Sequence, residues 1–319
     1  MRKIRVNAPN FRCRVIDHHD KTITWIGYAE SKEELESRLR RGFKDVVRIK
    51  PFDLGRWRNR AQIETGNVIK WRRENRGKKT GEYSWRDTVW KYLKVYLFSV
   101  TNGKCAFCET DALTVSPGDV EHYRPKAAVE GDETHMGYYW LAYSVENYLP
   151  SCGNCNSSGK MNKFPVSGTR AYAPDDDLKA EQPDLLNPFD PADDDPSAHL
   201  EFVVGGLETA KGTVGSKTNR GKQTIEILRL NREALVNRRS EQVLMFFQKL
   251  NEEFLKQSWL DQEGVKQERV IDLIRELDSG GPEYCEAKRA AAIVWLEDWT
   301  KRQEAQRSKI QAVLDSKNR

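Results

Sequence analysis

The sequence predicts an α+β protein, and three observations lead to that prediction. Near the start, the segments FRCRVID and ITWIGYA alternate apolar and polar side chains in the manner of strands. Two C-x-x-C pairs then enclose a segment of turns and short apolar runs. From about residue 219 onward, apolar residues recur at helical spacing, which predicts a bundle of long helices.

The composition is that of a polar chain without a membrane-spanning segment. Apolar residues make up 38% and charged residues 32% of the 319 residues, and the mean hydropathy is −0.76. No apolar run approaches the roughly 20 residues that cross a bilayer. The start MRKIRVNAPNFR lacks the apolar core of a signal peptide. We therefore expect a cytoplasmic protein that is not inserted in a membrane.

Five regions are expected along the chain, from changes in periodicity and composition. They are a small ββαβ module (1–55), a basic helical region (56–100), a core with the cysteine pairs (101–173), an acidic Asp/Pro-rich connector (174–199), and a hairpin followed by a helical C-terminal region (200–319).

Charge is distributed unevenly. Residues 38–79 hold 15 Lys/Arg against four Asp/Glu, whereas residues 174–196 hold nine Asp/Glu against one Lys. Trp57 and Trp71 lie inside the basic stretch, and aromatic rings among cations suit phosphates and unpaired bases. A solvated helix face explains such a stretch equally well. The prolines and like charges of the acidic stretch predict an extended, poorly ordered connector.

The two cysteine pairs predict a structural metal site. Cys105 and Cys108 form the first pair, Cys152 and Cys155 form the second, and 43 residues lie between the two pairs. Four thiolates at this spacing suit one tetrahedral zinc ion. Such an ion stabilises the fold because it joins two short segments that cannot bury a core alone. Taken alone, the pairs are more typical of a zinc ribbon without catalysis.

A second pattern lies between and just after the pairs. Glu121 and His122 stand in the segment DVEHYRPK, Asn147 precedes the second pair, and Asn156 directly follows it. Phosphodiester hydrolysis needs a base that deprotonates water and a cation that neutralises the phosphate. A histidine suits the first task. Carboxylate and amide oxygens are hard ligands that suit Mg²⁺ or Mn²⁺.

A histidine, a central asparagine and a terminal asparagine in this order resemble the HNH motif of the ββα-metal nuclease superfamily. The resemblance implies that His122 is the general base and that Asn147 braces the loop presenting it. It further implies that Glu121 and Asn156 hold one catalytic Mg²⁺ or Mn²⁺, and that the zinc is structural. Glu121 replaces the more usual aspartate and Asn156 the histidine of many members, and both changes suit a hard divalent cation better than catalytic zinc.

A narrower resemblance covers roughly residues 80 to 240. The phrases VEHYRPK, YWLAY, CxxCN followed by K and FP, DLLNPFD and LNREALVNRR are similar to HNH effectors of bacterial anti-phage systems, including Septu-type and retron-linked nucleases. This resemblance implies an endonuclease that hydrolyses DNA phosphodiester bonds. It also implies a regulatory protein partner, an ATPase or a phage-sensing complex, because an uncontrolled nuclease damages its host.

Four cations near the motif, Arg124, Lys126, Lys160 and Lys163, are predicted to contact phosphates, since such contacts position the backbone without reading bases. A solvated surface is the competing interpretation. Two other functions stay open. One is a zinc-ribbon nucleic-acid-binding or adaptor protein, and the other is an RNA-cleaving toxin on the same fold, because backbone contacts do not identify the sugar.

Overall fold

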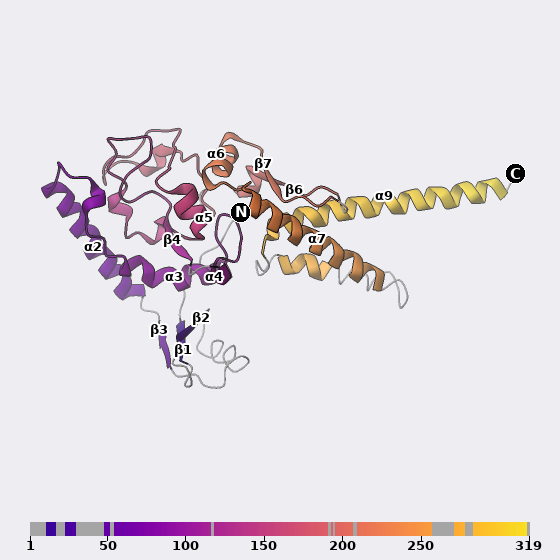
Figure 1. The fold of residues 1–319 in the computed structure, drawn as a ribbon, viewed down its shortest axis with the longest axis horizontal. Helices are drawn as coiled ribbons and strands as arrows, with labels where there is room; N and C mark the ends of the chain where they lie inside the picture. The colour runs from indigo at the N-terminus through magenta and orange to yellow at the C-terminus, as the bar shows by residue number, and fades with distance from the viewer. Residues whose placement is uncertain are drawn as a thin grey trace. The chain divides into compact units, whose positions relative to one another are not determined.

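In the computed structural model the chain forms two units, whose elements are labelled in Figure 1. The structure describes residues 11–16, 23–29, 48–51, 54–115, 118–190, 193, 195–206, 209–256, 271–277 and 283–317. The first unit runs to residue 198 and also includes residues 219–228, and the second comprises residues 199–218 and 229–319.

Three short strands form the first sheet. β1 (Phe11–Ile16), β2 (Ile23–Ala29) and β3 (Arg48–Pro51) are antiparallel, and β1 lies between the other two. The first two strands lie where the alternating segments predicted them. The helix expected between β2 and β3 falls outside the described residues.

Two helices, α2 (Leu54–Glu74) and α3 (Thr88–Val100), supply much of the core of the first unit. The buried residues of α3 recur at helical spacing and are Val89, Trp90, Leu93, Tyr96, Leu97 and Phe98. Trp57 of α2 is buried against them, and its indole N–H donates to the Val89 carbonyl at 2.8 Å. Trp57 is therefore a core residue, which corrects its interpretation as a nucleic-acid contact.

A hairpin stands at the centre of the first unit. Its strands β4 (Asp119–His122) and β5 (Tyr148–Ser151) pair antiparallel, with His122 opposite Tyr148. The one-turn helix α5 (Gly153–Cys155) and a π-helical turn (Asn156–Lys160) follow directly. The remaining short elements are α4 (Ala112–Val115) and the 3₁₀ turns Thr80–Glu82, Tyr139–Leu141, Val145–Asn147, Leu178–Glu181 and Pro196–Ala198. This mixture agrees with the predicted α+β class.

Helix α6 (Asn219–Leu228) packs on the π-helical turn. Gly159 allows this approach, because a Cβ at that position would lie 2.9 Å from the Asn154 carbonyl oxygen and 3.2 Å from that of Ile227. The turn after the second cysteine pair is therefore covered by a helix some 60 residues further along the chain.

The acidic connector packs into the first unit, which corrects the expectation of a loose, extended crossing. Within it, Glu181 and Leu186 are completely buried. The Leu186 N–H donates to the Thr224 hydroxyl of α6 at 3.0 Å. Arg124 pairs with Glu181, so the carboxylate does not force the segment into solvent.

The second unit combines a hairpin with two long helices. Its elements are β6 (Leu200–Val203), β7 (Thr213–Ser216), α7 (Glu233–Lys256) and α9 (Cys285–Lys317). The antiparallel β6–β7 pair confirms the predicted hairpin. Helices α7 and α9 lie side by side (Figure 1), and the Trp295 indole donates to Asn251 at 2.7 Å. Within the described residues, no helix combines the length and apolar character needed to cross a membrane.

Candidate metal centre and catalytic residues

Two short loops bring the four cysteines together at the β4–β5 hairpin. The first pair lies in the loop after α3, where the Ala106 N–H donates to the Pro150 carbonyl of β5 at 2.9 Å. The second pair begins directly after β5. There the N–H groups of Cys155 and Asn156 donate to the Cys152 carbonyl at 3.1 and 3.0 Å. The hairpin thus sets the position of both loops.

The four cysteine sulfurs form one buried cluster. The Sγ atoms of Cys105, Cys108, Cys152 and Cys155 all lie within 4.8 Å of one another, and those of Cys108 and Cys152 are 3.8 Å apart. Zinc–sulfur bonds of about 2.3 Å in a tetrahedron separate the sulfurs by about 3.8 Å, so the donor set and its spacing fit one zinc ion. Burial raises the pKa of the Cys105 thiol, whereas hydrogen bonds from the neighbouring thiols lower the pKa of Cys108.

His122, the last residue of β4, is held in one orientation. Its ring meets those of Trp90 and Tyr148 edge to face, at 5.0 and 5.2 Å between centroids, and only 6% of the residue is exposed. Its Nε2 lies 3.0 Å from the Ala142 carbonyl oxygen. A carbonyl only accepts, so this contact assigns the proton to Nε2 and the lone pair to Nδ1. Burial, followed by the charge of Lys126, holds the pKa of His122 well below its ordinary value, so the ring is neutral at pH 7.

Asn147 ties two loops together beside His122. Its Oδ1 accepts the Arg124 N–H at 2.7 Å, and its Nδ2 donates to the carbonyls of Arg124 at 3.0 Å and Leu141 at 3.2 Å. One loop directly follows His122, and the other supplies the Ala142 carbonyl. These contacts suit the bracing role that the resemblance implies for Asn147.

Glu121 forms a buried ion pair with Lys160. The ammonium lies 2.6 Å from Glu121 Oε1 and also donates to the His122 carbonyl at 2.9 Å. Lys160 is completely buried and Glu121 is 5% exposed. Burial raises the pKa of Glu121, and the Lys160 charge opposes that shift. In this structure the Lys160 ammonium is enclosed by protein and bound to Glu121, so its contact with phosphates stays a prediction.

Asn156 begins the turn that Lys160 ends. The Asn156 carbonyl accepts the Met161 N–H at 2.8 Å, which closes the turn, and the residue is half-buried. Because Lys160 contacts Glu121, the turn that carries Asn156 lies against β4. The turn that begins at Asn156 is thus held against β4 through the ammonium of Lys160.

The other three predicted phosphate contacts are half-buried and have protein partners. Arg124 Nε donates to Glu181 at 2.7 Å. The Lys126 ammonium lies 5.2 Å from the Trp90 ring centroid, and Lys163 donates to a backbone carbonyl at 3.2 Å. These cations are thus oriented by the protein around the hairpin instead of lying free in solvent.

Two residues of this region escaped the sequence prediction. Glu181 accepts hydrogen bonds from Arg124 and from the Tyr138 hydroxyl, the latter at 2.5 Å. It lies in the acidic stretch, where nothing in the sequence distinguishes it from the neighbouring carboxylates. Trp90, which contacts His122, did carry a signal, because it is adjacent to Val89 and shares the apolar stripe of α3.

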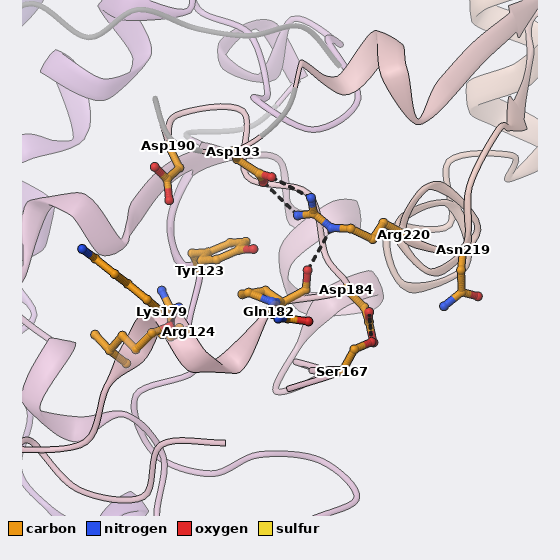
Figure 2. Close-up of a pocket in the computed structure, with 12 residues that line it drawn as sticks. Tyr123, Arg124, Ser167, Lys179, Gln182, Asp184, Asp190, Asp193, Asn219 and Arg220 are labelled. Atoms are coloured by element: carbon orange, nitrogen blue, oxygen red, sulfur yellow. Dashed lines mark hydrogen bonds and ion pairs between the residues drawn. The ribbon is translucent and has the colours of Figure 1, made fainter. Parts of the chain in front are cut away.

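A cavity of about 630 Å³ adjoins the chain directly after His122 (Figure 2). Arg220 reaches Asp193 in it with two hydrogen bonds, of 2.7 and 3.0 Å. Of the predicted site residues, only Arg124 lines this cavity. The cavity is therefore distinct from the cluster of His122, Glu121 and Lys160.

Comparisons with known proteins give relatives for part of the chain. It is 41% identical over 155 residues to the Septu protein PtuB of Bacillus mycoides (strain KBAB4), covering 47% of this chain and 50% of that protein. It is 31% identical over 148 residues to the Septu protein PtuB of Bacillus thuringiensis, covering 46% and 44%. It is 30% identical over 157 residues to the Septu protein PtuA of the same B. mycoides strain, covering 47% and 20%.

These matches confirm the resemblance to Septu proteins for just under half of the chain. The chain spans half or less of the length of these relatives. No family model and no solved structure matches it.

Proposed function

We propose that this chain is a metal-dependent endonuclease of the HNH type that hydrolyses DNA phosphodiester bonds as an effector of anti-phage defence. One observation carries the proposal. A neutral histidine with a defined tautomer, His122, lies beside a buried carboxylate, Glu121, and both are fixed by a hairpin that ends in a four-cysteine cluster.

In this proposal His122 is the general base. Its Nε2–H is engaged by the Ala142 carbonyl, so Nδ1 is the atom that accepts the proton of the attacking water. The low pKa of the ring keeps that lone pair available at pH 7. Asn147 holds the loops on both sides of the ring and thereby fixes the direction of Nδ1.

Glu121 and Asn156 are the residues proposed to hold the catalytic ion. The ion pair with Lys160 uses Oε1 of Glu121, so Oε2 is the oxygen proposed for the metal, together with the Asn156 amide oxygen. Both are hard oxygen donors, which suit Mg²⁺ or Mn²⁺. Such an ion would neutralise charge on the scissile phosphate. Lys160 would retain Glu121 as a carboxylate and orient it.

A protein partner is part of the proposal. His122 and Glu121 are only 6% and 5% exposed, so water and DNA need a rearrangement to reach them. The relatives bear two names, PtuB and PtuA, within one Septu system. We therefore propose that a partner of the PtuA kind, or the sensing of a phage, opens the site.

The test is cleavage of plasmid DNA in the presence of Mg²⁺ or Mn²⁺. The protein partner is added if the protein alone does not cleave. His122→Ala should lower the rate by about 10² to 10⁴ while zinc content and DNA binding stay unchanged. His135→Ala is the matched control, because His135 is also buried and its Nε2 contacts a backbone carbonyl, that of Ala171, at 2.8 Å. Equal cleavage by His122→Ala and the wild type would exclude the proposed base.

A second candidate function is a zinc-stapled adaptor without catalysis. The observation in its favour is that Glu121 is already neutralised by Lys160 and His122 is buried among aromatic rings. The plasmid assay separates the candidates, because an adaptor binds its partner or nucleic acid but gives no cleavage that depends on His122.

A further inference from the structure

A groove of about 590 Å³ lies between the end of α2 and the segment that leads into α3. Its floor carries three half-buried aromatic residues, Trp71, Tyr83 and Trp85. The ring centroids of Trp71 and Tyr83 are 5.4 Å apart, and those of Tyr83 and Trp85 are 5.0 Å apart. The rings meet edge to face, so they form a continuous aromatic surface that is only partly covered.

The groove is held in shape by the loop that follows α2. The Arg72 guanidinium donates to the carbonyls of Asn75, Arg76 and Lys78 at 3.0, 3.2 and 2.5 Å. The Asn75 side chain donates back to the Trp71 carbonyl at 2.9 Å. A ligand therefore meets a surface that is already ordered, which lowers the entropic cost of binding.

The carboxylates that line the groove do not exclude an anionic polymer. Each carboxylate that lines it is paired with a cation: Glu64 with Arg86 at 3.5 Å, Glu74 with Lys70 at 3.9 Å, and Asp87 with Lys91. Four further cations, in the last turn of α2 and in the loop after it, are exposed, namely Arg73, Arg76, Lys78 and Lys79. Aromatic rings and exposed cations on one segment of the chain are the combination that suits bases joined by phosphates.

The groove also connects to the proposed catalytic residues. The Lys126 ammonium lies over both the Trp85 ring, at 5.9 Å, and the Trp90 ring, at 5.2 Å. Trp90 in turn contacts His122. A strand that passes from the groove over Lys126 would therefore reach the region of His122.

We propose that this aromatic groove stacks an unpaired base of single-stranded DNA next to the site of cleavage. The proposal rests on the proposed nuclease function and specifies its substrate as DNA with an unpaired segment. Stacking needs an exposed base face, which a paired base inside a duplex does not offer. The groove therefore favours single strands over perfect duplex.

The test is binding of a labelled single-stranded DNA oligonucleotide and of the matching duplex, measured by fluorescence anisotropy. The full chain carrying His122→Ala is used, so that binding is read without cleavage. Trp71→Leu should weaken single-strand binding by about tenfold to a hundredfold, while Trp71→Phe should retain most of it. An oligonucleotide containing 2-aminopurine should lose fluorescence on binding, and Trp71→Leu should restore it.

Ile63→Ala is the matched control, since Ile63 is 63% exposed on the same helix and lies outside the groove. Zinc content and urea midpoint verify that each variant is folded. Unchanged single-strand binding by Trp71→Leu overturns the inference. The inference is also overturned if Trp71→Leu still binds DNA but no longer binds the protein partner, because the groove would then be a protein-docking surface. If Trp71→Leu loses DNA binding but the wild type never cleaves DNA, the inference that the groove binds DNA is supported and the nuclease proposal fails.

Discussion

The Lys160 ammonium and the Glu121 carboxylate form an ion pair of 2.6 Å inside the first unit, with Lys160 fully enclosed. The pair connects β4 to the turn after the second cysteine pair. A buried charge that loses its partner is costly, because the protein interior solvates it poorly. This relationship makes Lys160 a structural support for both Glu121 and His122.

Removing Lys160 should therefore destabilise the protein strongly. We expect Lys160→Met to lower the free energy of unfolding by about 3–5 kcal/mol, measured by urea denaturation of the zinc-loaded protein. Lys70→Met is the matched control, because the pair of Lys70 with Glu74 is exposed and 3.9 Å long, and it should change stability by less than about 1 kcal/mol. Adding Glu121→Gln to Lys160→Met should recover much of the loss. Equal effects of the two lysine variants would contradict the prediction.

Metal removal should unfold the core around the β4–β5 hairpin. The purified protein should contain about one zinc ion per chain, because four thiolates saturate one tetrahedral ion. A chelator or Cys152→Ser should remove the ion and abolish cooperative unfolding of the first unit. Cys285→Ser is the control, since Cys285 is buried but lies outside the cluster. Elemental analysis that finds no zinc in folded, untagged protein would refute the assignment.

Stability should fall as the pH drops below about 6.5, partly because of His135. Burial lowers the pKa of His135 in the folded protein, and its Nδ1 accepts the Gly137 N–H at 2.9 Å, which protonation would prevent. The unfolded state therefore binds the proton of His135 more readily than the folded state does. The contribution of His135 to stability is thus complete above the pKa that it has in the unfolded chain, and it is lost as the pH falls below that value. Urea midpoints between pH 8 and pH 5 should decline less steeply for His135→Gln. An equally steep decline in both proteins would exclude this contribution.

Salt dependence tests the exposed cations at the end of α2. Each phosphate contact on single-stranded DNA contributes about 0.7 to the slope of log affinity against log salt. Replacing both Arg73 and Arg76 by Gln should thus reduce the slope by about 1.4. Lys179→Gln with Lys222→Gln is the control, because these exposed cations lie in the connector and on α6, away from α2 and its loop in the sequence. If the control reduced the slope equally, the salt dependence would reflect the overall charge of the protein and not the cations at the end of α2.

Local patterns in the sequence were enough to predict two strands and the four-cysteine cluster. Alternation predicted β1 and β2, because this pattern depends only on neighbouring residues. The spacing of Cys105 with Cys108, and of Cys152 with Cys155, predicted the cluster, since four thiolates at this spacing suit one tetrahedral ion.

Which charges are buried, and what they contact, depends on residues that are far apart in the sequence. Lys160 reads as a surface cation in the sequence, and Glu181 as one carboxylate in an acidic run, yet both are enclosed by partners 39 and 57 residues away, Glu121 and Arg124. Trp57 likewise stands among arginines but packs inward against α3. A charged side chain is buried only where a partner compensates the cost of its desolvation. The partners of Lys160 and Glu181 are far away in the sequence, so the neighbouring residues do not reveal them.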